Sequence, residues 1–440
     1  MMNNKTLEKP ASLDVAIIGG GPAGISAGLE LSRRAGLKVA LFERDEQLGG
    51  IPRSCHFFFG MRDRKRLYTG PAYARKLNRL IRETPVQIHT GAMVLNVIPG
   101  NLGGMHHLDV LSPKGLMSYK SRFILLATGC CESSRHERQI PGGRPAGIFT
   151  TGTLQQLINI DQLRLRGRRA IIIGSELVAF SSVLTLKHAG VSIAGMVENY
   201  PELHSYPVLS ETMRRFYGFP IYKDTSVFEI LGNNHVKGVT LLANKGQERF
   251  QVNCDMVVLT GRFRPESALI ENTAIERDPS STGPAVNMNL LTSVPNIYAA
   301  GNVLRGADMH DLCALEGRLA ARNILKRLTS PESTTDGWIP LRAQAPIRYV
   351  VPQKIDPRYI KKGCFRRIFP WPAIQIEYTL KNGSVAAFSG TERIWEGSFH
   401  KLIANNRYPL PVEKFDWNRV DSTHGIVLKI RHKLFPNRQQ

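Results

Sequence analysis

The glycine-rich segment Gly19–Gly24 constrains the fold more than any other part of the chain, because it reads G-G-G-P-A-G and matches the pattern G-x-G-x-x-G. The apolar run 14–19 (D-V-A-I-I-G) is typical of a strand that is buried on both faces, and a helical stretch follows from Pro22 to about Ala35. Residues 38–43 (K-V-A-L-F-E) form the next predicted strand. This order predicts a βαβ unit that binds a dinucleotide.

The residues of this unit have separate roles. Gly19 permits the tight turn, Gly21 lets a pyrophosphate approach the backbone, and Gly24 lets the helix pack closely on the strand. The helix that begins at Pro22 presents free N–H groups and a partial positive charge to the phosphates. Glu43 ends the second strand, where a carboxylate accepts hydrogen bonds from the adenosine ribose and disfavours a 2′-phosphate by charge repulsion.

The same pattern recurs in the middle of the chain. Residues 169–174 (R-A-I-I-I-G) and 191–198 are predicted strands, with a predicted helix at 177–189 between them. Two such units in one chain, the second embedded in the first domain, can place two nucleotides face to face. Further buried strands are predicted at 122–128, 256–261 and 296–301, with a helix from about 315 to 328.

Three stretches make the chain similar to the FAD-dependent pyridine-nucleotide oxidoreductase family. They are the fingerprint with Glu43–Arg44 and the turn Leu48–Gly50, the segment Ala127–Gly129 (A-T-G), and the segment Thr292–Asn302 (T-S-V-P-N-I-Y-A-A-G-N). In that family the last position is an aspartate that binds the ribityl chain of FAD. Asparagine can still accept and donate hydrogen bonds but carries no charge. We therefore expect FAD to bind, and we expect the redox tuning of the flavin to be the property that the missing charge could change.

The resemblance covers about residues 12–330 and implies an α/β fold of two nested Rossmann-like three-layer domains; a small β-rich C-terminal region is expected to follow them. Residues 12–150 and 263–330 are expected to form the FAD-binding domain, 151–262 an NAD(P)-type domain that interrupts it, and 331–440 the C-terminal region. FAD is the expected cofactor, and the residues expected to contact it are Gly19, Gly21, Pro22, Ala23, Gly24, Glu43, Arg44, Gly50, Ala127, Thr128, Gly129, Gly301 and Asn302.

The second unit departs from the nucleotide-binding pattern. It reads Gly174-Ser-Glu176-Leu-Val-Ala179, so that a glutamate stands at the middle glycine position, although Glu198 still ends the second strand. The side chain and charge of Glu176 are expected at the point where a pyrophosphate must come close. We therefore expect this domain to serve as a scaffold or to hold another nucleotide, and NAD(P) binding is the disfavoured alternative.

The C-terminal region is assigned from alternation and one turn signal. The segments 374–380 and 384–389 are rich in strand-forming residues, and Asn382–Gly383 between them is a hairpin signal. A polar linker at 329–337 precedes the region. These patterns predict a β-rich region with a hairpin turn at Asn382–Gly383.

The cysteines do not indicate disulfide-reductase chemistry or a metal site. The six cysteines contain no C-x-x-C pair, and no metal is expected. Cys55 stands alone after the G-G turn and is expected to be a small buried side chain rather than a reactive thiol, and Cys130 and Cys131 are also expected to serve packing. Arg53, Cys55 and His56 could reach the flavin and are the weak catalytic candidates; an ordinary hydrogen-bonded histidine is the favoured reading of His56.

A narrower resemblance comes from Gly50–Arg53, Thr69–Arg75 and Glu137–Gln156. These segments resemble the FAD-containing subunits of opine oxidase, proline dehydrogenase complexes and hydrogen cyanide synthase. The implied function is that of the flavin subunit of a multi-subunit dehydrogenase or oxidase, with a small amine or hydroxy substrate and a second flavoprotein or electron-acceptor subunit as partner. The alternatives are a stand-alone NAD(P)H-dependent flavin reductase and a non-catalytic scaffold subunit that holds FAD.

Composition limits the partners and the location. The 440 residues carry a formal charge of +22, but the basic residues are dispersed and no nucleic-acid-binding module accompanies them. We expect them to lie mainly on solvated faces, with an acidic protein partner as the second interpretation and nucleic acid as the last.

No apolar run is long enough for a transmembrane segment and the N-terminus resembles no secretory signal, so a cytoplasmic protein is expected, with peripheral membrane association as the alternative.

Overall fold

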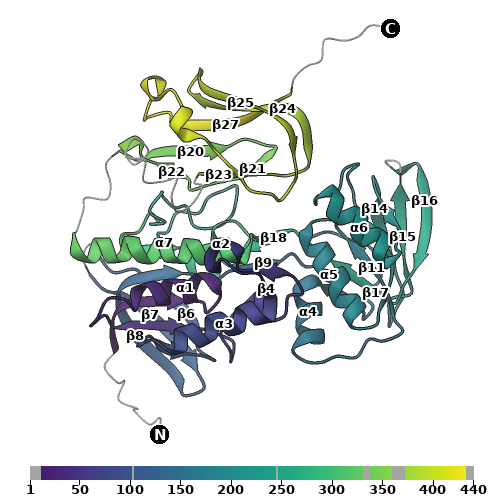
Figure 1. The fold of residues 1–440 in the computed structure, drawn as a ribbon, viewed down its shortest axis with the longest axis horizontal. Coiled ribbons are helices and arrows are strands. Elements are labelled where there is room, and N and C mark those ends of the chain that lie inside the picture. Colours follow the sequence, from purple (N-terminus) through teal and green to yellow (C-terminus); the bar gives the residue numbers. More distant parts are fainter. Residues whose placement is uncertain (1–10, 102–103, 244–245, 331–336, 359–371, 433–440) are drawn as a thin grey trace.

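The computed structural model describes residues 11–101, 104–243, 246–330, 337–358 and 372–432. Figure 1 shows the three parts of the molecule: a first Rossmann-like domain, a second one beside it, and a β-rich region at the C-terminal end of the chain that lies over both. Cys364 and most of the 329–337 linker lie outside the described residues. No helix of the described residues is long and apolar enough to cross a membrane.

The first domain is built on one sheet that is parallel in its centre. Its strand order is β5-β2-β1-β8-β7-β6, and β19 pairs with β8 from outside this path. β8 pairs in parallel with β1 and β19 and in antiparallel with β7. The strands of this sheet are β1 (Ala11–Ile18), β2 (Val39–Phe42), β5 (Gln87–His89), β6 (Met93–Ile98), β7 (His106–Ser112), β8 (Gly115–Leu126) and β19 (Ile297–Ala299).

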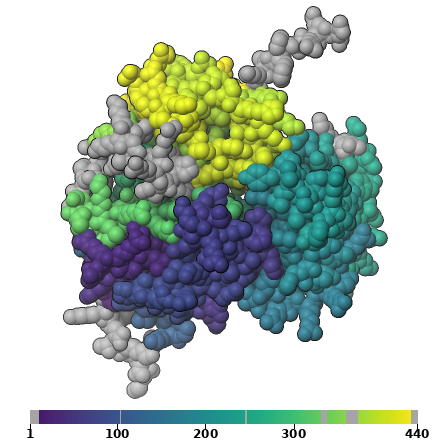
Figure 2. Space-filling model, in the orientation of Figure 1, coloured from purple at the N-terminus to yellow at the C-terminus, as the bar shows by residue number. Residues whose placement is uncertain are grey.

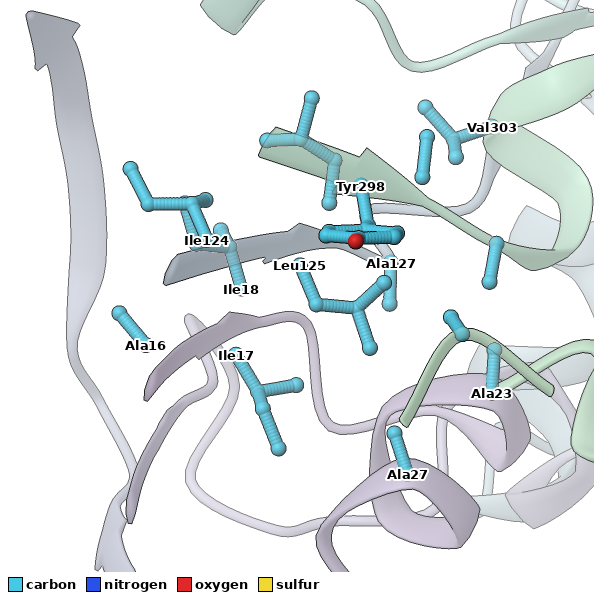
Figure 3. Packing of buried hydrophobic residues seen from close by; sticks show 14 of the residues in the cluster. Ala16, Ile17, Ile18, Ala23, Ala27, Ile124, Leu125, Ala127, Tyr298 and Val303 are labelled. Carbon is cyan, nitrogen blue, oxygen red and sulfur yellow. The ribbon is translucent and has the colours of Figure 1, made fainter. Parts of the chain in front are cut away.

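Three long helices accompany this sheet: α1 (Pro22–Leu31), α3 (Gly70–Arg82) and α7 (His310–Thr329). α7 lies so close to α1 that a Cβ atom on Gly317 would stand 2.0 Å from the carbonyl oxygen of Ala23. Figure 3 shows apolar side chains of β1, β8 and α1 packed near Tyr298 and Val303, which follow the inserted second domain in the sequence. The core of the first domain is therefore completed by residues that follow the inserted second domain.

The second domain has a parallel sheet in the order β10-β17-β11-β12-β13 and an antiparallel sheet in the order β14-β15-β16. Helices α4 (Thr151–Asn159), α5 (Leu177–His188) and α6 (Pro207–Tyr217) belong to this part of the chain. Its strands are β10 (Ile148–Thr150), β11 (Arg169–Ile173), β12 (Ser192–Val197), β13 (Ile221–Tyr222), β14 (Ser226–Leu231), β15 (Gly238–Ala243), β16 (Glu248–Asn253) and β17 (Met256–Leu259).

Two short antiparallel strands carry the chain between the domains. β9 (Cys130–Glu132) leaves the first domain and pairs with β18 (Phe263–Pro265), which returns to it. A small lobe of the first domain, β3 (Phe58–Phe59), α2 (Met61–Arg64) and β4 (Tyr68–Thr69), lies beside this crossing. The predicted nesting of two Rossmann-like domains is thus confirmed.

The C-terminal region is β-rich, as predicted. One sheet has the order β22-β20-β27-β24-β25 and a smaller one the order β21-β23-β26. Their strands are β20 (Ile339–Ala343), β21 (Ile347–Val351), β22 (Lys354–Ile355), β23 (Ala373–Ile376), β24 (Leu380–Ser389), β25 (Glu392–Leu402), β26 (Tyr408–Pro409) and β27 (Ile426–His432).

The predicted hairpin at Asn382–Gly383 is wrong. β24 runs straight through these two residues, and Gly383 pairs with Phe399 of β25. The hairpin turn lies at Gly390 and Thr391, where Gly390 has a φ of +57°. Asn382 does adopt a left-handed φ of +51°, but it does so as an irregularity inside the strand.

Candidate functional site

A cavity of about 460 Å³ lies at the carboxyl ends of β1, β2 and β8. In an open α/β sheet this edge is where ligands bind. Most of the residues expected to contact the cofactor line it, namely Gly19, Gly21, Pro22, Ala23, Glu43, Arg44, Gly50, Ala127, Thr128, Gly129 and Asn302. The fold therefore brings the three family-like stretches of the sequence to one site.

The three glycines of the fingerprint differ in what surrounds them. A Cβ atom on Gly19 would stand 2.3 Å from the carbonyl oxygen of Ala127, and one on Gly24 would stand 1.9 Å from that of Gly19. These two glycines are required by the contact between turn, helix and strand. A Cβ atom on Gly21 would meet no protein atom within 4 Å, because the backbone at this position faces the open cavity.

Glu43 stands at one end of the cavity, and the turn holds its carboxylate in place. Its Oε2 accepts a hydrogen bond from the Gly20 N–H at 2.7 Å, and its Oε1 accepts one from the Asp45 N–H at 2.9 Å. Burial raises the pKa of Glu43, and these two N–H groups oppose that rise. The carboxylate is thus fixed where an adenosine ribose would contact it.

Asn302 stands at the other end, together with the first turn of α7. Its Oδ1 accepts hydrogen bonds from the Asp308 N–H at 2.9 Å and from the Cys313 thiol at 3.1 Å. Because the Asp308 N–H and the Cys313 thiol both donate to Oδ1, this atom is the amide oxygen and the NH₂ group is the donor side of the amide; Cys130 is a further hydrogen-bond partner of Asn302. An aspartate would present a second acceptor there in place of a donor.

A buried ion network supports this end of the cavity. The Glu316 carboxylate of α7 accepts a hydrogen bond from the Gly301 N–H at 2.9 Å and pairs with Arg305 at 2.6 Å. Arg305 also pairs with Asp308 at 2.9 Å. Arg407, from the C-terminal region, reaches both Glu316 at 3.2 Å and Asp308 at 3.4 Å. The C-terminal region therefore contacts the residues that position Gly301 and Asn302.

The charges of this network depend on one another. Burial alone would raise the pKa of Asp308, but Arg305 and Arg407 outweigh burial and hold that pKa below its usual range. The side chains of Arg305 and Glu316 are almost completely excluded from solvent. Each charge in the network is stable only because the opposite charges are present.

The weak catalytic candidates are placed differently from one another. Arg53 lines the cavity and pairs with Asp45 at 3.1 Å, whereas Cys55 and His56 face the second domain. The Cys55 thiol lies 3.5 Å from the Ser181 hydroxyl of α5, and burial raises its pKa to about 11. Such a thiol is a poor nucleophile, as the sequence led us to expect.

His56 joins the two domains. Its Nδ1 lies 3.1 Å from the Thr185 hydroxyl and 3.0 Å from the side-chain nitrogen of Asn159. Burial, and then the neighbouring His188, lowers the pKa of His56. The imidazole is consequently a neutral hydrogen-bonding group between the first domain and helices α4 and α5, and it does not line the cavity.

Several cavity residues were not predicted. Met93, Val94 and Leu95 come from β6, which carries no motif, and Gln156 comes from α4. His310 and Cys313 lie in the first turn of α7, which begins at His310 and not at about 315 as predicted. Their position eight to eleven residues after Asn302 is the signal that could have found them. Burial lowers the pKa of His310 to about 4, so its imidazole is neutral.

The second nucleotide site is filled by the protein itself. The Glu176 side chain turns back over the loop, and its Oε2 accepts a hydrogen bond from the Ser175 N–H at 3.0 Å. A Cβ atom on Gly261 would stand 2.2 Å from the Glu176 carboxylate, and one on Gly174 would stand 2.9 Å from it. Where the first domain has open space at Gly21, the second domain holds a carboxylate. Burial raises the pKa of this carboxyl group.

The rest of the second site is also engaged within the chain. The Oε2 of Glu198 accepts a hydrogen bond from the Ser175 hydroxyl, and Oε1 accepts one from the Tyr200 N–H at 3.2 Å. The segment that follows β12 is packed against the C-terminal region: the rings of Tyr200 and Tyr378 stack at 5.7 Å, and Glu202 pairs with Lys381 at 2.5 Å.

The fold and the cavity define a class of protein: a flavoprotein oxidoreductase with two dinucleotide-type domains, of which the first retains the open cradle. The model of the pyridine nucleotide-disulphide oxidoreductase family matches residues 13–321, and the chain belongs to this family. It is an FAD-dependent oxidoreductase.

Relatives and solved structures agree with this assignment. The chain is 26% identical to the glutamate synthase [NADPH] small chain of Escherichia coli, over 73% of this chain and 70% of that protein. It is also 26% identical to hydrogen cyanide synthase subunit HcnB of Pseudomonas aeruginosa, over 71% of each. The fold is similar to that of T. acidophilum thioredoxin reductase, with a TM-score of 0.62 and 19% identity over 72% of this chain and 99% of that one.

The residues of the cavity fit FAD. The open space at Gly21 suits a pyrophosphate, the N-terminus of α1 favours its negative charge, and the fixed carboxylate of Glu43 suits a ribose. Bound there, FAD would supply the chemistry of hydride and electron transfer. The chain's own part is to bind and orient the cofactor and to set its surroundings through the Asn302 amide and the α7 N-terminus.

Proposed function

We propose that this chain is the FAD subunit of a multi-subunit dehydrogenase or oxidase that acts on a small amine or hydroxy substrate. FAD is held by residues that line the cavity, among them Gly19, Glu43 and Asn302, and Gly301 stands beside this lining. The observation that carries the proposal is the Glu176 carboxylate, which occupies the cradle where a nicotinamide nucleotide would place its pyrophosphate. Electrons then have to come from a substrate or a partner subunit.

Two kinds of relative support different parts of this proposal. Hydrogen cyanide synthase subunit HcnB and the glutamate synthase small chain are named as parts of larger enzymes, which favours a subunit role. Two relatives, glutamate synthase [NADPH] and ferredoxin–NADP reductase, are named for a nicotinamide nucleotide, which favours the second candidate function, an NAD(P)H-dependent flavin reductase. A second nucleotide site that is open to NAD(P)H would favour the reductase, and one that is closed by Glu176 favours the subunit role.

The first experiment is anaerobic reduction of the purified holoprotein, followed at the flavin absorbance band. We expect no bleaching by NADH or NADPH and bleaching by a member of a panel of amino and hydroxy acids. Bleaching by either nucleotide would establish the reductase in place of our proposal. A flavin that exchanges electrons with no panel member and no added acceptor would indicate a scaffold subunit.

Replacement of Glu176 tests the blocked cradle directly. In Glu176→Gly the carboxylate is removed and the middle glycine of the pattern is restored, so we expect NADH to bind at least tenfold more tightly than to the wild type, measured by calorimetry. Glu176→Gln is the matched control, because it removes the charge but keeps the volume, and we expect it to remain blocked. Equal NADH affinity in the wild type and Glu176→Gly would show that Glu176 does not close the site.

A further inference from the structure

The lobe formed by residues 57–69 exposes large apolar side chains. Phe58, Met61 and Leu67 have 49%, 54% and 55% of their surface exposed, and Ile51, just before the lobe, has 48%. Figure 2 shows this violet segment at the surface, between green α7 and the teal second domain. Large apolar side chains that are exposed together in a soluble protein mark an interaction surface.

The exposed charge of the lobe is entirely positive. Lys65 and Arg66 are exposed, and among the described residues neither has a carboxylate partner. Arg62 is half-exposed and pairs with Asp311 at 3.4 Å. The single acidic residue of the lobe, Asp63, is buried against Arg64 and Arg318. A partner surface that complements this lobe must therefore be acidic, with an apolar centre.

The lobe is firmly attached to the wall of the cavity. The Arg62 N–H donates a hydrogen bond to Asp311 at 3.2 Å, and the Arg318 guanidinium donates to the carbonyl oxygen of Asp63 at 3.3 Å. Both Asp311 and Arg318 belong to α7, whose first turn lines the cavity with His310. Ile51, which precedes the lobe in the sequence, is exposed and also lines the cavity. The lobe is thus tied to the wall of the cofactor site through α7.

We propose that the apolar and basic face of this lobe docks an acidic electron-accepting protein subunit. The inference rests on the proposed function as a subunit of a larger enzyme. In the transfer, the reduced FAD of this chain is oxidised by two electrons with release of two protons, and the oxidised flavin of the partner takes up two electrons and two protons. A protein partner is favoured over a membrane because relatives of this chain are named as subunits.

The test uses holoprotein whose flavin has been photoreduced anaerobically, so that its result does not depend on the substrate. Oxidised flavodoxin is the acidic probe, and its reduction is followed by stopped-flow spectroscopy. Two double variants alter the lobe: Lys65→Glu/Arg66→Glu reverses its exposed charge, and Met61→Ser/Leu67→Ser removes apolar surface. We expect each to lower the second-order rate constant of flavodoxin reduction at least tenfold, and we expect the wild-type rate constant to fall with added salt. FAD content and the melting temperature should match the wild type, because these side chains are exposed.

Two controls make the result specific. Arg34→Glu/Lys114→Glu carries the same charge change outside the lobe and should leave the flavodoxin rate within twofold of the wild type. Oxidation by uncharged benzoquinone should be the same in all variants. Flavodoxin rates that do not depend on the lobe variants or on salt would overturn the proposal. Lobe-dependent binding to anionic phosphatidylserine vesicles, with unchanged flavodoxin rates, would also overturn it and assign the face to a membrane.

Discussion

Glutamine at position 316 is expected to destabilise the protein by about 3–5 kcal/mol, the usual cost of removing one partner from a buried ion pair. Glutamine keeps the size of the side chain and an acceptor for the Gly301 N–H. It removes the negative charge that neutralises Arg305 and, from the C-terminal region, Arg407. Asp308 is then the only remaining carboxylate beside the two buried guanidinium groups within the described network.

The measurement is equilibrium urea unfolding of the wild type and Glu316→Gln, followed by fluorescence and by flavin release. Glu211→Gln is the matched control, since Glu211 pairs with Arg214 and Arg215 at the surface, and its unfolding midpoint should equal that of the wild type. FAD should also bind more weakly to Glu316→Gln, because the ion network behind this wall of the cavity loses the charge that pairs with Arg305 and Arg407. A midpoint equal to that of the control would mean that the buried network contributes little.

Alanine at position 21 is expected to weaken FAD binding about 100-fold, which is roughly 2.7 kcal/mol, and to leave the apoprotein intact. Gly21 has a φ of −80°, which alanine adopts without strain, and a Cβ atom there meets no protein atom. The methyl group instead enters the space that a pyrophosphate would fill. Titration of the apoprotein with FAD gives the affinity, and thermal unfolding of the apoprotein tests its stability.

Gly24→Ala is the contrasting variant. Its Cβ atom would stand 1.9 Å from the carbonyl oxygen of Gly19, so we expect the apoprotein itself to be destabilised. The two variants together distinguish a glycine that makes room for the ligand, Gly21, from a glycine that the packing of the fold requires, Gly24. If Gly21→Ala bound FAD as tightly as the wild type, the pyrophosphate could not lie against this turn.

The nested fold and the cofactor cavity were predictable because local signals carry them. The fingerprint around Gly21 couples a strand, a glycine turn and a helix within a few residues, and Glu43 confirms it from the next strand. The segments ending at Gly129 and Asn302 are motifs of the same kind. The structure brings these residues to one cavity. Their contact with FAD stays a prediction until the affinity of variants such as Gly21→Ala has been measured.

Other features depend on contacts between distant residues, which one sequence does not show. Arg407 reaches Glu316 across 91 positions of the chain, and the interdomain contacts of Cys55 cross 126 positions to Ser181. The hairpin signal at Asn382–Gly383 was overridden because β24 pairs with both β25 and β27 across Gly383. A local turn propensity is weaker than pairing on both edges of a central strand.

The position of β19 in the first sheet has a consequence for how the chain matures. Residues 297–299 complete that sheet by pairing with β8, and the last wall of the cavity is built by residues 300–313. During synthesis the N-terminal 150 residues therefore present an unfinished sheet edge while the whole inserted domain is being made. We therefore expect cofactor uptake to follow emergence of α7 from the ribosome, because a chain that is cut short before that helix retains the fingerprint but lacks one wall of the cavity.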